Sequence, residues 1–572
     1  MPGTTFTVAD YLLARLREVG LAHLFAVPGD YCSPFLEALD ATPEIARVAT
    51  VNELGSGYAA DGYARYRGIG AACVQYGVGT FSLLNCTAGS YVERVPVAVI
   101  SASPSTEDRA LERTKGILFH HSTGDLRADQ LVFQNVTVAS EIIHGAADAP
   151  AQIDRAITAM LTHRRPIYLE ILTDVWTQAC ARPSGTLAAR RASSDPASLA
   201  AALDAAWSRI CAARLPVVWA GVEIQRHGLA GTLQQIVDRS GLPFTTTSLG
   251  KTVLDESQPQ FIGTYAGPAS PAITRAVMAA TDCPLALGTI ITDDYLDIMK
   301  SKFGDMIEVT DSLARVGHQY FRQVTLEDFT LGLLARFSSS GGHPRTYELP
   351  AVPADAAIES APDDPLTYNR FYHELTGFLG HRKLLSEIAL ILGESTSLYV
   401  FGNLFGLPRN GFVAQAAWGS LGHEIGCALG VALGSGKRPL VVAGDGGFRM
   451  ICQELSSLAR QRCNAVVFVL SNQGYAIEQA FVDVQAFQPD GQFAPFDVLP
   501  PWDYAALARG FGARSYRAQN VRELRAVLAE IEHLTDVPAL VEVVIPQKDL
   551  APQLARLAGA PVLTRKYGRG PS

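Results

Sequence analysis

Short apolar runs alternate with longer amphipathic stretches along the whole chain, in three successive parts. Runs this apolar are typical of strands buried on both faces, and the stretches between them predict helices. We therefore expect an α/β protein built from three doubly wound parallel-sheet domains. The runs are HLFAVPG, GAACVQYGVG and VPVAVISAS in the first part, LPVVWAGV, LPFTTTS and CPLALGT in the second, and RPLVVAGDGG, NAVVFVLSN and PALVEVVIP in the third.

Two stretches interrupt this rhythm, one from Cys180 to Ser198 and one from Ser338 to Pro365. Both are rich in Pro, Ser, Gly and Ala and lack apolar periodicity, which is typical of linkers. The sequence therefore predicts three domains. Their expected boundaries are 1–182, 197–340 and 364–550.

Composition narrows the class of protein. The 572 residues are 48% hydrophobic and carry a net charge of -9, which disfavours a nucleic-acid binder with a concentrated basic face. The nine cysteines are scattered without a C-x-x-C pair, so neither a disulfide framework nor a zinc site is indicated. The start lacks the pattern of a signal peptide, and no apolar run is long enough to span a membrane. We expect a soluble cytoplasmic protein without membrane or nucleic-acid partners.

One stretch of the third part combines two strand ends with metal-binding chemistry. An apolar run ends at the GDG that contains Asp445, and the next apolar run ends at Asn472, 27 positions later. Both ends of a parallel β-α-β unit lie at one edge of the sheet, so the two side chains should meet there. With the Gly474 carbonyl they would form half of an oxygen shell for Mg²⁺. Taken singly, Asp445 is better explained as a turn residue and helix cap, and Asn472 as an ordinary turn residue at a strand end.

Together the two residues give the chain a resemblance to thiamine diphosphate enzymes, whose signature is GDG followed at about this distance by Asn. The first Asn of the family's usual pair is Ser471 here. The resemblance implies the thiamine diphosphate-binding fold, with thiamine diphosphate and Mg²⁺ as cofactors. The implied metal ligands are Asp445, Asn472 and Gly474, and the implied cofactor contacts in the third part include Ser395, Gly444, Gly446, Gly447, Tyr475 and Ile477.

The resemblance also explains an acid in a segment of small residues. In VNELGSGYAADGYAR, Glu53 fits the glutamate that contacts the aminopyrimidine of a cofactor held by the other subunit. This contact implies a homodimer that forms the active sites, with a homotetramer as the expected assembly. In AAWGSLGHE, Leu421 fits the wedge between the cofactor rings and Gly419 the carbonyl that receives the amino group. Helix capping by Glu53 is the alternative.

Three further stretches resemble the 2-oxo acid decarboxylases of the pyruvate and indolepyruvate decarboxylase type. They are VPGDYCSPFLEAL with Asp30, GILFHHSTGD with His120 and His121, and NQGYAIEQAF with Glu478. The resemblance implies non-oxidative decarboxylation of a 2-oxo acid to an aldehyde and CO₂ through a C2-thiazolium adduct and an enamine. Asp30 and Glu478 would transfer protons at the substrate, with the two histidines orienting or relaying.

The family pattern also implies the substrate pocket. Tyr399, Ile477 and Phe481 should line it, with Asp294 near its mouth. Tyrosine is intermediate in size between the tryptophan of pyruvate-selective relatives and the smaller residues that accompany longer substrates. An acid at position 294 indicates a polar or charged substrate tail.

Three other functions remain open from the sequence. An acetolactate synthase-like carboligase would keep the cofactor motif but normally lacks the adjacent histidine pair. A catalytically silent cofactor-binding protein is opposed by the presence of every expected acid and base. A nicotinamide oxidoreductase is disfavoured because the middle part has no G-x-G-x-x-G fingerprint.

Overall fold

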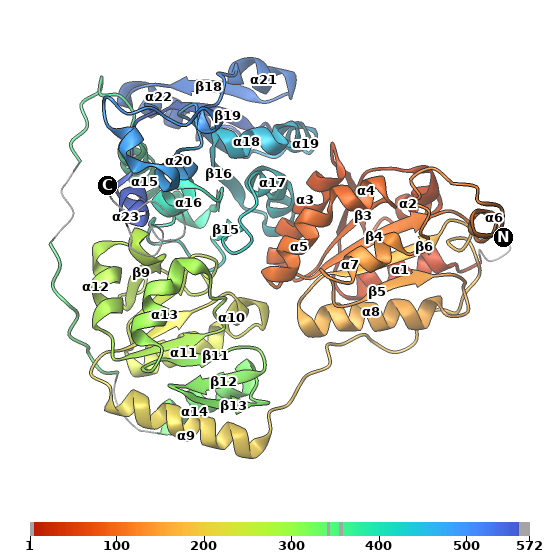
Figure 1. Ribbon diagram of the computed structural model, residues 1–572, viewed down its shortest axis with the longest axis horizontal. Coiled ribbons are helices and arrows are strands. Elements are labelled where there is room, and N and C mark those ends of the chain that lie inside the picture. The colour runs from red at the N-terminus through yellow and green to blue at the C-terminus, as the bar shows by residue number, and fades with distance from the viewer. Residues whose placement is uncertain (1–4, 340–343, 354–357, 560–572) are drawn as a thin grey trace. The chain divides into compact units, whose positions relative to one another are not determined.

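The computed structural model describes residues 5–339, 344–353 and 358–559. These residues form three sheets and divide into two compact units (Figure 1). The N-terminal unit contains the described residues of 1–191 together with 418–439 and 451–465, and the second unit contains those of 192–417, 440–450 and 466–572. Two late segments of the chain therefore complete the N-terminal unit.

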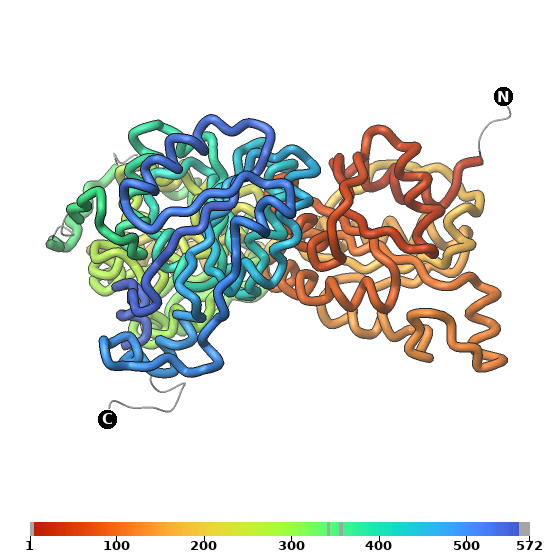
Figure 2. Tube along the Cα trace, turned by 90° about the horizontal axis from the view of Figure 1, so that it is seen from above, coloured from red at the N-terminus to blue at the C-terminus, as the bar shows by residue number. Residues whose placement is uncertain are grey.

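The N-terminal unit is built on a parallel sheet of strand order β2-β1-β3-β4-β6-β5. Its chain path, red to orange, can be followed from above in Figure 2. The strands are β1 (His23–Ala26), β2 (Ala46–Ala49), β3 (Gly70–Gln75), β4 (Val97–Ser103), β5 (Ser140–Ile143) and β6 (Ile167–Leu172). The helices are α1 (Val8–Glu18), α2 (Ser33–Asp40), α3 (Glu53–Arg67), α4 (Val78–Ser82), α5 (Leu84–Val92), α6 (Thr106–Lys115), α7 (Ala128–Phe133), α8 (Ala149–His163), α17 (His423–Ser435) and α19 (Leu455–Arg460).

Helices α3 and α17 pack closely because glycines occupy their contact faces. A Cβ atom on Gly62 would lie 2.4 Å from the carbonyl oxygen of Cys427, and one on Gly430 would lie 1.8 Å from the carbonyl oxygen of Ala59. Any larger side chain at these two positions would force the helix backbones apart. The small residues around Glu53 therefore serve helix packing.

A buried ionic network joins α3 to its neighbours. Arg65 pairs with Asp61 at 2.6 Å and with Glu93 at 2.6 Å, and His423 of α17 contacts Asp61 at 2.9 Å. Burial alone would raise the pKa of Asp61, but Arg65 and His423 hold it well below its usual range. Arg65 thus bridges two buried carboxylates and holds the network together.

Replacement of Arg65 by methionine is expected to lower the free energy of unfolding by about 3–5 kcal/mol, because it removes the cation that two buried carboxylates share. Urea denaturation of the purified protein measures this change. Arg67→Met is the matched control, since Arg67 is exposed at the end of the same helix and should change stability little. A loss no larger than that of the control would show that the network does not support the fold.

The second unit contains the other two sheets. The middle sheet has the order β13-β12-β11-β10-β7-β8-β9, and its edge strands β12 and β13 run antiparallel to their neighbours. Its strands are β7 (Pro216–Ala220), β8 (Phe244–Thr247), β9 (Phe261–Tyr265), β10 (Cys283–Leu287), β11 (Ile307–Val309), β12 (Leu313–Val316) and β13 (Gln319–Arg322). Its helices are α9 (Pro196–Ala212), α10 (Glu223–Arg226), α11 (Ala230–Ser240), α12 (Ala272–Ala280), α13 (Leu296–Lys302) and α14 (Leu326–Ser339).

The last sheet has the order β15-β14-β16-β17-β19-β18, with parallel pairing of β16, β17, β19 and β18. Its strands are β14 (Ile388–Leu392), β15 (Phe412–Ala414), β16 (Arg438–Gly444), β17 (Val466–Ser471), β18 (Arg514–Ala518) and β19 (Ala539–Val544). Its helices are α15 (Tyr368–His381), α16 (Thr396–Phe401), α18 (Asp445–Ile451), α20 (Ala476–Val482), α21 (Tyr504–Gly510), α22 (Val521–Ile531) and α23 (Pro552–Ala558).

The predicted fold class is confirmed, with one difference. All nine quoted apolar runs contain strands, but the middle sheet is mixed rather than purely parallel, because the hairpin β12–β13 pairs antiparallel at its edge. The first predicted linker is shorter than expected, since α9 begins at Pro196. The second lies partly outside the described residues, and the domain boundaries remain predictions.

All nine cysteines carry free thiols. No helix in the described ranges has the length and hydropathy to cross a membrane.

Candidate active site

The ends of β16 and β17 place Asp445 and Asn472 at one edge of the last sheet. Gly444 is in register with Leu470 on the neighbouring parallel strand. The Asp445 carboxylate accepts hydrogen bonds from the backbone N–H of Gly446 at 2.9 Å and of Gln473 at 2.8 Å. One aspartate oxygen thus contacts the backbone directly after Asn472.

Asn472 is held in one orientation. Its side chain is buried, its Nδ2 donates to the hydroxyl of Tyr368 at 3.1 Å, and its Oδ1 accepts from the N–H of Gly474 at 3.2 Å. The amide oxygen therefore lies on the side of Gly474, the third predicted ligand.

The charge at this edge fits a divalent cation. Asp445 is 1% exposed, and burial raises its pKa to about 6. In the described chain its hydrogen bonds come from backbone N–H groups and none comes from a cationic side chain. Arg449 acts on this carboxylate only through space, so a hard cation would be the first positive charge in direct contact with it. Carboxylate, amide and carbonyl oxygens are the preferred ligands of such a cation. No cluster of three His, Cys, Asp or Glu occurs among the described residues, which accords with a set that contains a single carboxylate.

The predicted diphosphate contacts surround the same turn. A Cβ atom on Gly446 would lie 2.3 Å from the ring of Tyr475, so any larger residue there would displace that ring. The Ser395 hydroxyl, at the start of α16, lies 3.6 Å from the place of a Cβ on Gly444. Gly447 is buried in the first turn of α18. The Ser395 hydroxyl and the glycine backbone therefore lie close together at this turn.

Glu53 lies elsewhere, as the first residue of α3 in the N-terminal unit. It is half-buried, and its Cγ lies 3.5 Å from the place of a Cβ on Gly79. Asn52 caps the helix by accepting from the N–H of Gly55 at 2.8 Å, so the capping task falls to Asn52 rather than to Glu53. The carboxylate of Glu53 is therefore not needed to cap the helix.

A second acid, which no sequence pattern indicated, supports this helix start. Glu454 accepts hydrogen bonds from the N–H of Val51 at 3.1 Å and of Asn52 at 3.3 Å. It lies 403 positions from Val51, so only the folded chain reveals the contact. Glu454 fixes the segment from which Glu53 projects.

The turn that carries Gly419 and Leu421 belongs to the same unit. Both Gly419 and Gly422 adopt positive φ angles, 71° and 91°, and Leu421 between them is half-buried. The hydroxyl of Tyr58, on α3, lies 2.6 Å from that of Ser420. The helix of Glu53 and the turn of the predicted wedge are therefore joined directly.

The end of β3 contacts two of the predicted acid and base segments. Gln75 Nε2 donates to Asp30 Oδ1 at 2.6 Å, and the Tyr76 hydroxyl donates to the carbonyl of His120. His120 and His121 are both exposed, with ring centroids 6.3 Å apart. The ring of His121 meets that of Tyr76 edge to face at 6.0 Å, and its φ is +73°.

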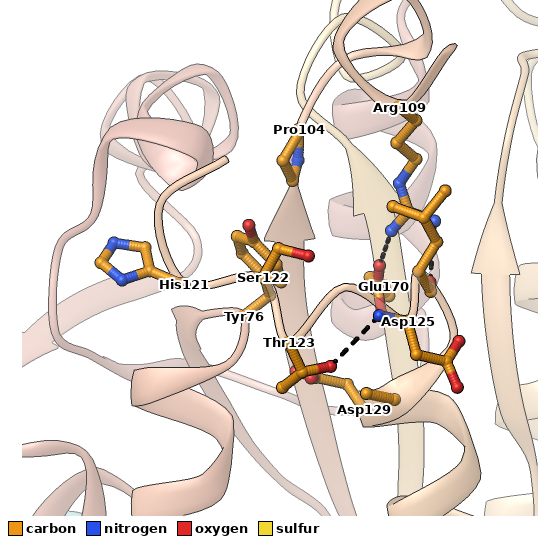
Figure 3. Close-up of a pocket in the computed structure, with 11 residues that line it drawn as sticks. Tyr76, Pro104, Arg109, His121, Ser122, Thr123, Asp125, Asp129 and Glu170 are labelled. Carbon is orange, nitrogen blue, oxygen red and sulfur yellow. Dashed lines mark hydrogen bonds and ion pairs between the residues drawn. The ribbon is translucent and has the colours of Figure 1, made fainter. Parts of the chain in front are cut away.

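A buried polar cluster supports the histidine loop (Figure 3). Asp129 accepts from the N–H of Gly77 at 2.8 Å and from the Thr80 hydroxyl, which anchors the turn after β3. Beside it Arg109 pairs with Glu170, whose pKa is raised by burial. The members of the cluster are buried and hydrogen-bonded beneath the loop, so we interpret it as a support for the loop rather than as an open substrate site.

The residues predicted to line the substrate pocket belong to the second unit. Tyr399, on α16, donates its hydroxyl to Asp294 Oδ1 at 3.1 Å, and burial followed by the charge of Asp294 raises its pKa. Tyr399 and Ile477 belong to one apolar cluster, against which Phe481 packs. Glu478 is exposed on α20, next to the buried Ile477.

The predicted site residues thus fall into two groups. Asp30, Glu53, His120, His121, Gly419 and Leu421 belong to the N-terminal unit, and the metal, diphosphate and pocket residues, with Glu478, belong to the second unit. In the first group Asp30 and His120 contact neighbouring residues at the end of β3. In the second, Asp445 contacts the backbone after Asn472, and Tyr399 contacts Asp294. Their assignment to a shared active site remains a prediction.

Three family models match the chain. Residues 6–132 match the thiamine pyrophosphate enzyme N-terminal TPP binding domain, residues 203–328 its central domain, and residues 397–543 its C-terminal TPP binding domain.

Curated relatives match over nearly the whole length. An alpha-keto-acid decarboxylase of Mycobacterium leprae is 31% identical over 560 residues, which cover 96% of this chain and 95% of the relative. Proteins of the same name from Mycobacterium tuberculosis strain H37Rv and Mycobacterium avium are each 30% identical, over 97% and 96% of both chains respectively.

Proposed function

Because the chain belongs to the thiamine pyrophosphate enzyme family, we propose that it is a thiamine diphosphate-dependent 2-oxo acid decarboxylase that releases CO₂ and an aldehyde. The observation that carries the proposal is the pairing of Asp445 with the Asn472 strand end in a chain similar throughout to alpha-keto-acid decarboxylases. A carboligase would need the same pairing, so the distinction rests on the acid and base residues and on these relatives.

The cofactor would supply the electron sink that accepts the electrons of the carbon–carbon bond to the leaving carboxylate. On this proposal Asp445, Asn472 and the Gly474 carbonyl hold Mg²⁺, and the metal and the glycine turn hold the diphosphate. The supporting observation is the buried Asp445 carboxylate, whose hydrogen bonds come from backbone groups alone in the described chain.

The remaining residues would bind the rings of the cofactor and move protons. Glu53 would share a proton with the pyrimidine ring, while Leu421 and the Gly419 carbonyl hold the rings in a bent arrangement. Asp30 and Glu478 would protonate the substrate oxygen and the carbon that loses CO₂, and the histidine pair would orient or relay. Tyr399 would limit the size of the substrate, with its hydroxyl fixed by Asp294.

We also propose the assembly and the compartment. A homodimer would bring Glu53 of one subunit to the cofactor of the other, and two dimers would form a tetramer. Nine free thiols favour a reducing compartment, the cytoplasm.

The direct test is to supply the purified protein with thiamine diphosphate, Mg²⁺ and a panel of 2-oxo acids, and to couple product to an aldehyde reductase. We expect aldehyde formation that stops when a chelator removes the metal. Acetolactate without aldehyde from the panel would favour the carboligase instead.

Tyr399→Ala should raise kcat/KM for 2-oxo acids with long tails relative to pyruvate by about 10-fold, the value of one or two methylene groups in a pocket.

A further inference from the structure

Strand β3 carries a polar side chain that no role described so far explains. Every position of β3, GAACVQ, is buried, and Gln75 at its end is 6% exposed. A buried primary amide is costly unless its donor and acceptor groups are satisfied. A glutamine at this position is therefore expected to have hydrogen-bond partners for both its N–H₂ group and its carbonyl oxygen.

Both ends of the Gln75 amide have partners. Its Nε2 donates to Asp30 Oδ1 at 2.6 Å. Its Oε1 lies 3.7 Å from the thiol sulfur of Cys32, whose single S–H has the carbonyl of Val74 as its nearer acceptor at 3.3 Å. The carboxylate of Asp30 fixes which end of the amide faces it, because a flipped amide would set its carbonyl oxygen against the carboxylate oxygen, with no hydrogen between two acceptors.

The neighbouring backbone leaves Gln75 little freedom. A Cβ atom on Gly29 would lie 2.5 Å from Gln75 Oε1, so the amide packs directly against the backbone that leads into Asp30. Strands β1 and β3 are adjacent, with Ala26 in register with Cys73, and this register brings Gln75 alongside the turn after β1. Asp30 itself is exposed, so a rigid buried donor holds a carboxylate that would otherwise be mobile.

We propose that Gln75 is the positioning residue of Asp30 in the decarboxylation reaction, an inference that rests on the proposed function. The amide occupies Oδ1 and fixes the carboxyl group in one rotamer, which directs Oδ2 to the substrate. Gln75 neither takes nor gives a proton, because an amide does not titrate in the working range. The proton passes between Asp30 Oδ2 and the substrate, and Gln75 acts only through Asp30.

A double-mutant cycle tests whether Gln75 acts through Asp30. The variants are Gln75→Met, which keeps the length of the side chain but removes the donor, Asp30→Asn, and the double variant, each assayed as the holoenzyme. Gln75→Met should lower kcat about 10- to 100-fold, the range of a hydrogen bond to a charged group, with KM for thiamine diphosphate unchanged. Asp30→Asn should be slower still, and the double variant no slower than Asp30→Asn.

The matched control is Gln152→Met, on α8 of the same unit. Gln152 also donates to a carboxylate, that of Glu141 at 3.1 Å, but it has no part in the proposed site. It should leave kcat unchanged. If Gln75→Met matches the wild type, or if its loss multiplies with that of Asp30→Asn, the proposal is overturned.

A second cycle separates this inference from the proposed function. The same variants are compared by the midpoint of thermal unfolding, and we expect the shifts of Gln75→Met and Asp30→Asn not to add. Non-additive shifts in a protein that forms no aldehyde from any 2-oxo acid would keep the contact and reject both the proposed function and the catalytic role. Additive shifts would show that the contact is absent in solution, which overturns the inference whatever the activity.

Discussion

Glu53→Gln is expected to lower kcat for aldehyde formation by about 10³-fold, within the range of a lost acid or base. Glutamine keeps the shape of the side chain but cannot share a proton with the pyrimidine ring. Because Asn52 caps α3, the helix and its contacts should remain intact. The measurement is the coupled aldehyde assay at saturating thiamine diphosphate and Mg²⁺, with cofactor affinity followed by calorimetry.

The control for this prediction is Glu107→Gln, since Glu107 is an exposed acid in the first turn of α6 and has no proposed contact with the cofactor. It should retain full activity. A Glu53→Gln enzyme with wild-type kcat would remove Glu53 from the mechanism and leave its position at the helix start without a function.

Asp445→Asn is expected to weaken the binding of Mg²⁺ and thiamine diphosphate by about 100-fold or more, the effect of removing one member of a buried ionic pair. The substitution leaves the size of the side chain unchanged, so the loss would report charge. Calorimetric titration of the apoprotein with the cofactor in the presence of Mg²⁺ measures it directly.

The competing explanation is that Asp445 only stabilises the start of α18. Asp503→Asn provides the comparison, because Asp503 caps α21 by accepting from the N–H of Ala506 at 2.8 Å. If Asp445 were only a cap, both variants would keep their stability, because asparagine caps a helix as well as aspartate does, and both would bind the cofactor alike. Equal affinities in the two variants would therefore refute the metal site.

The sequence predicted the strands well because those of parallel sheets are buried on both faces and so stand out as apolar runs. The edge hairpin β12–β13 escaped prediction. Its residues Gln319 and Tyr320 are exposed, so the run lacks the apolar signal that marked the other strands. The close packing of α3 on α17 could not be predicted either, because nothing in the sequence around a glycine indicates which distant helix it contacts.

The residues of the candidate site also differ in whether a local sequence pattern could identify them. Asp445 and Asn472 could be paired from the sequence, because a single β-α-β unit fixes the relation between its two strand ends. Glu53 needed the resemblance to a known family. Gln75 and Glu454 could not be found from the sequence, because their partners lie 45 and 403 positions away and no local pattern records such a contact.

The packing of α3 against α17 has a consequence for biosynthesis. The first 191 residues of the chain belong to a unit that is completed only by residues 418–439 and 451–465. At about 5–20 residues per second, the ribosome takes roughly 10–50 s to cross the intervening segment. During that interval the glycine-lined face of α3 emerges without its partner helix, which makes the nascent chain a natural client for chaperones.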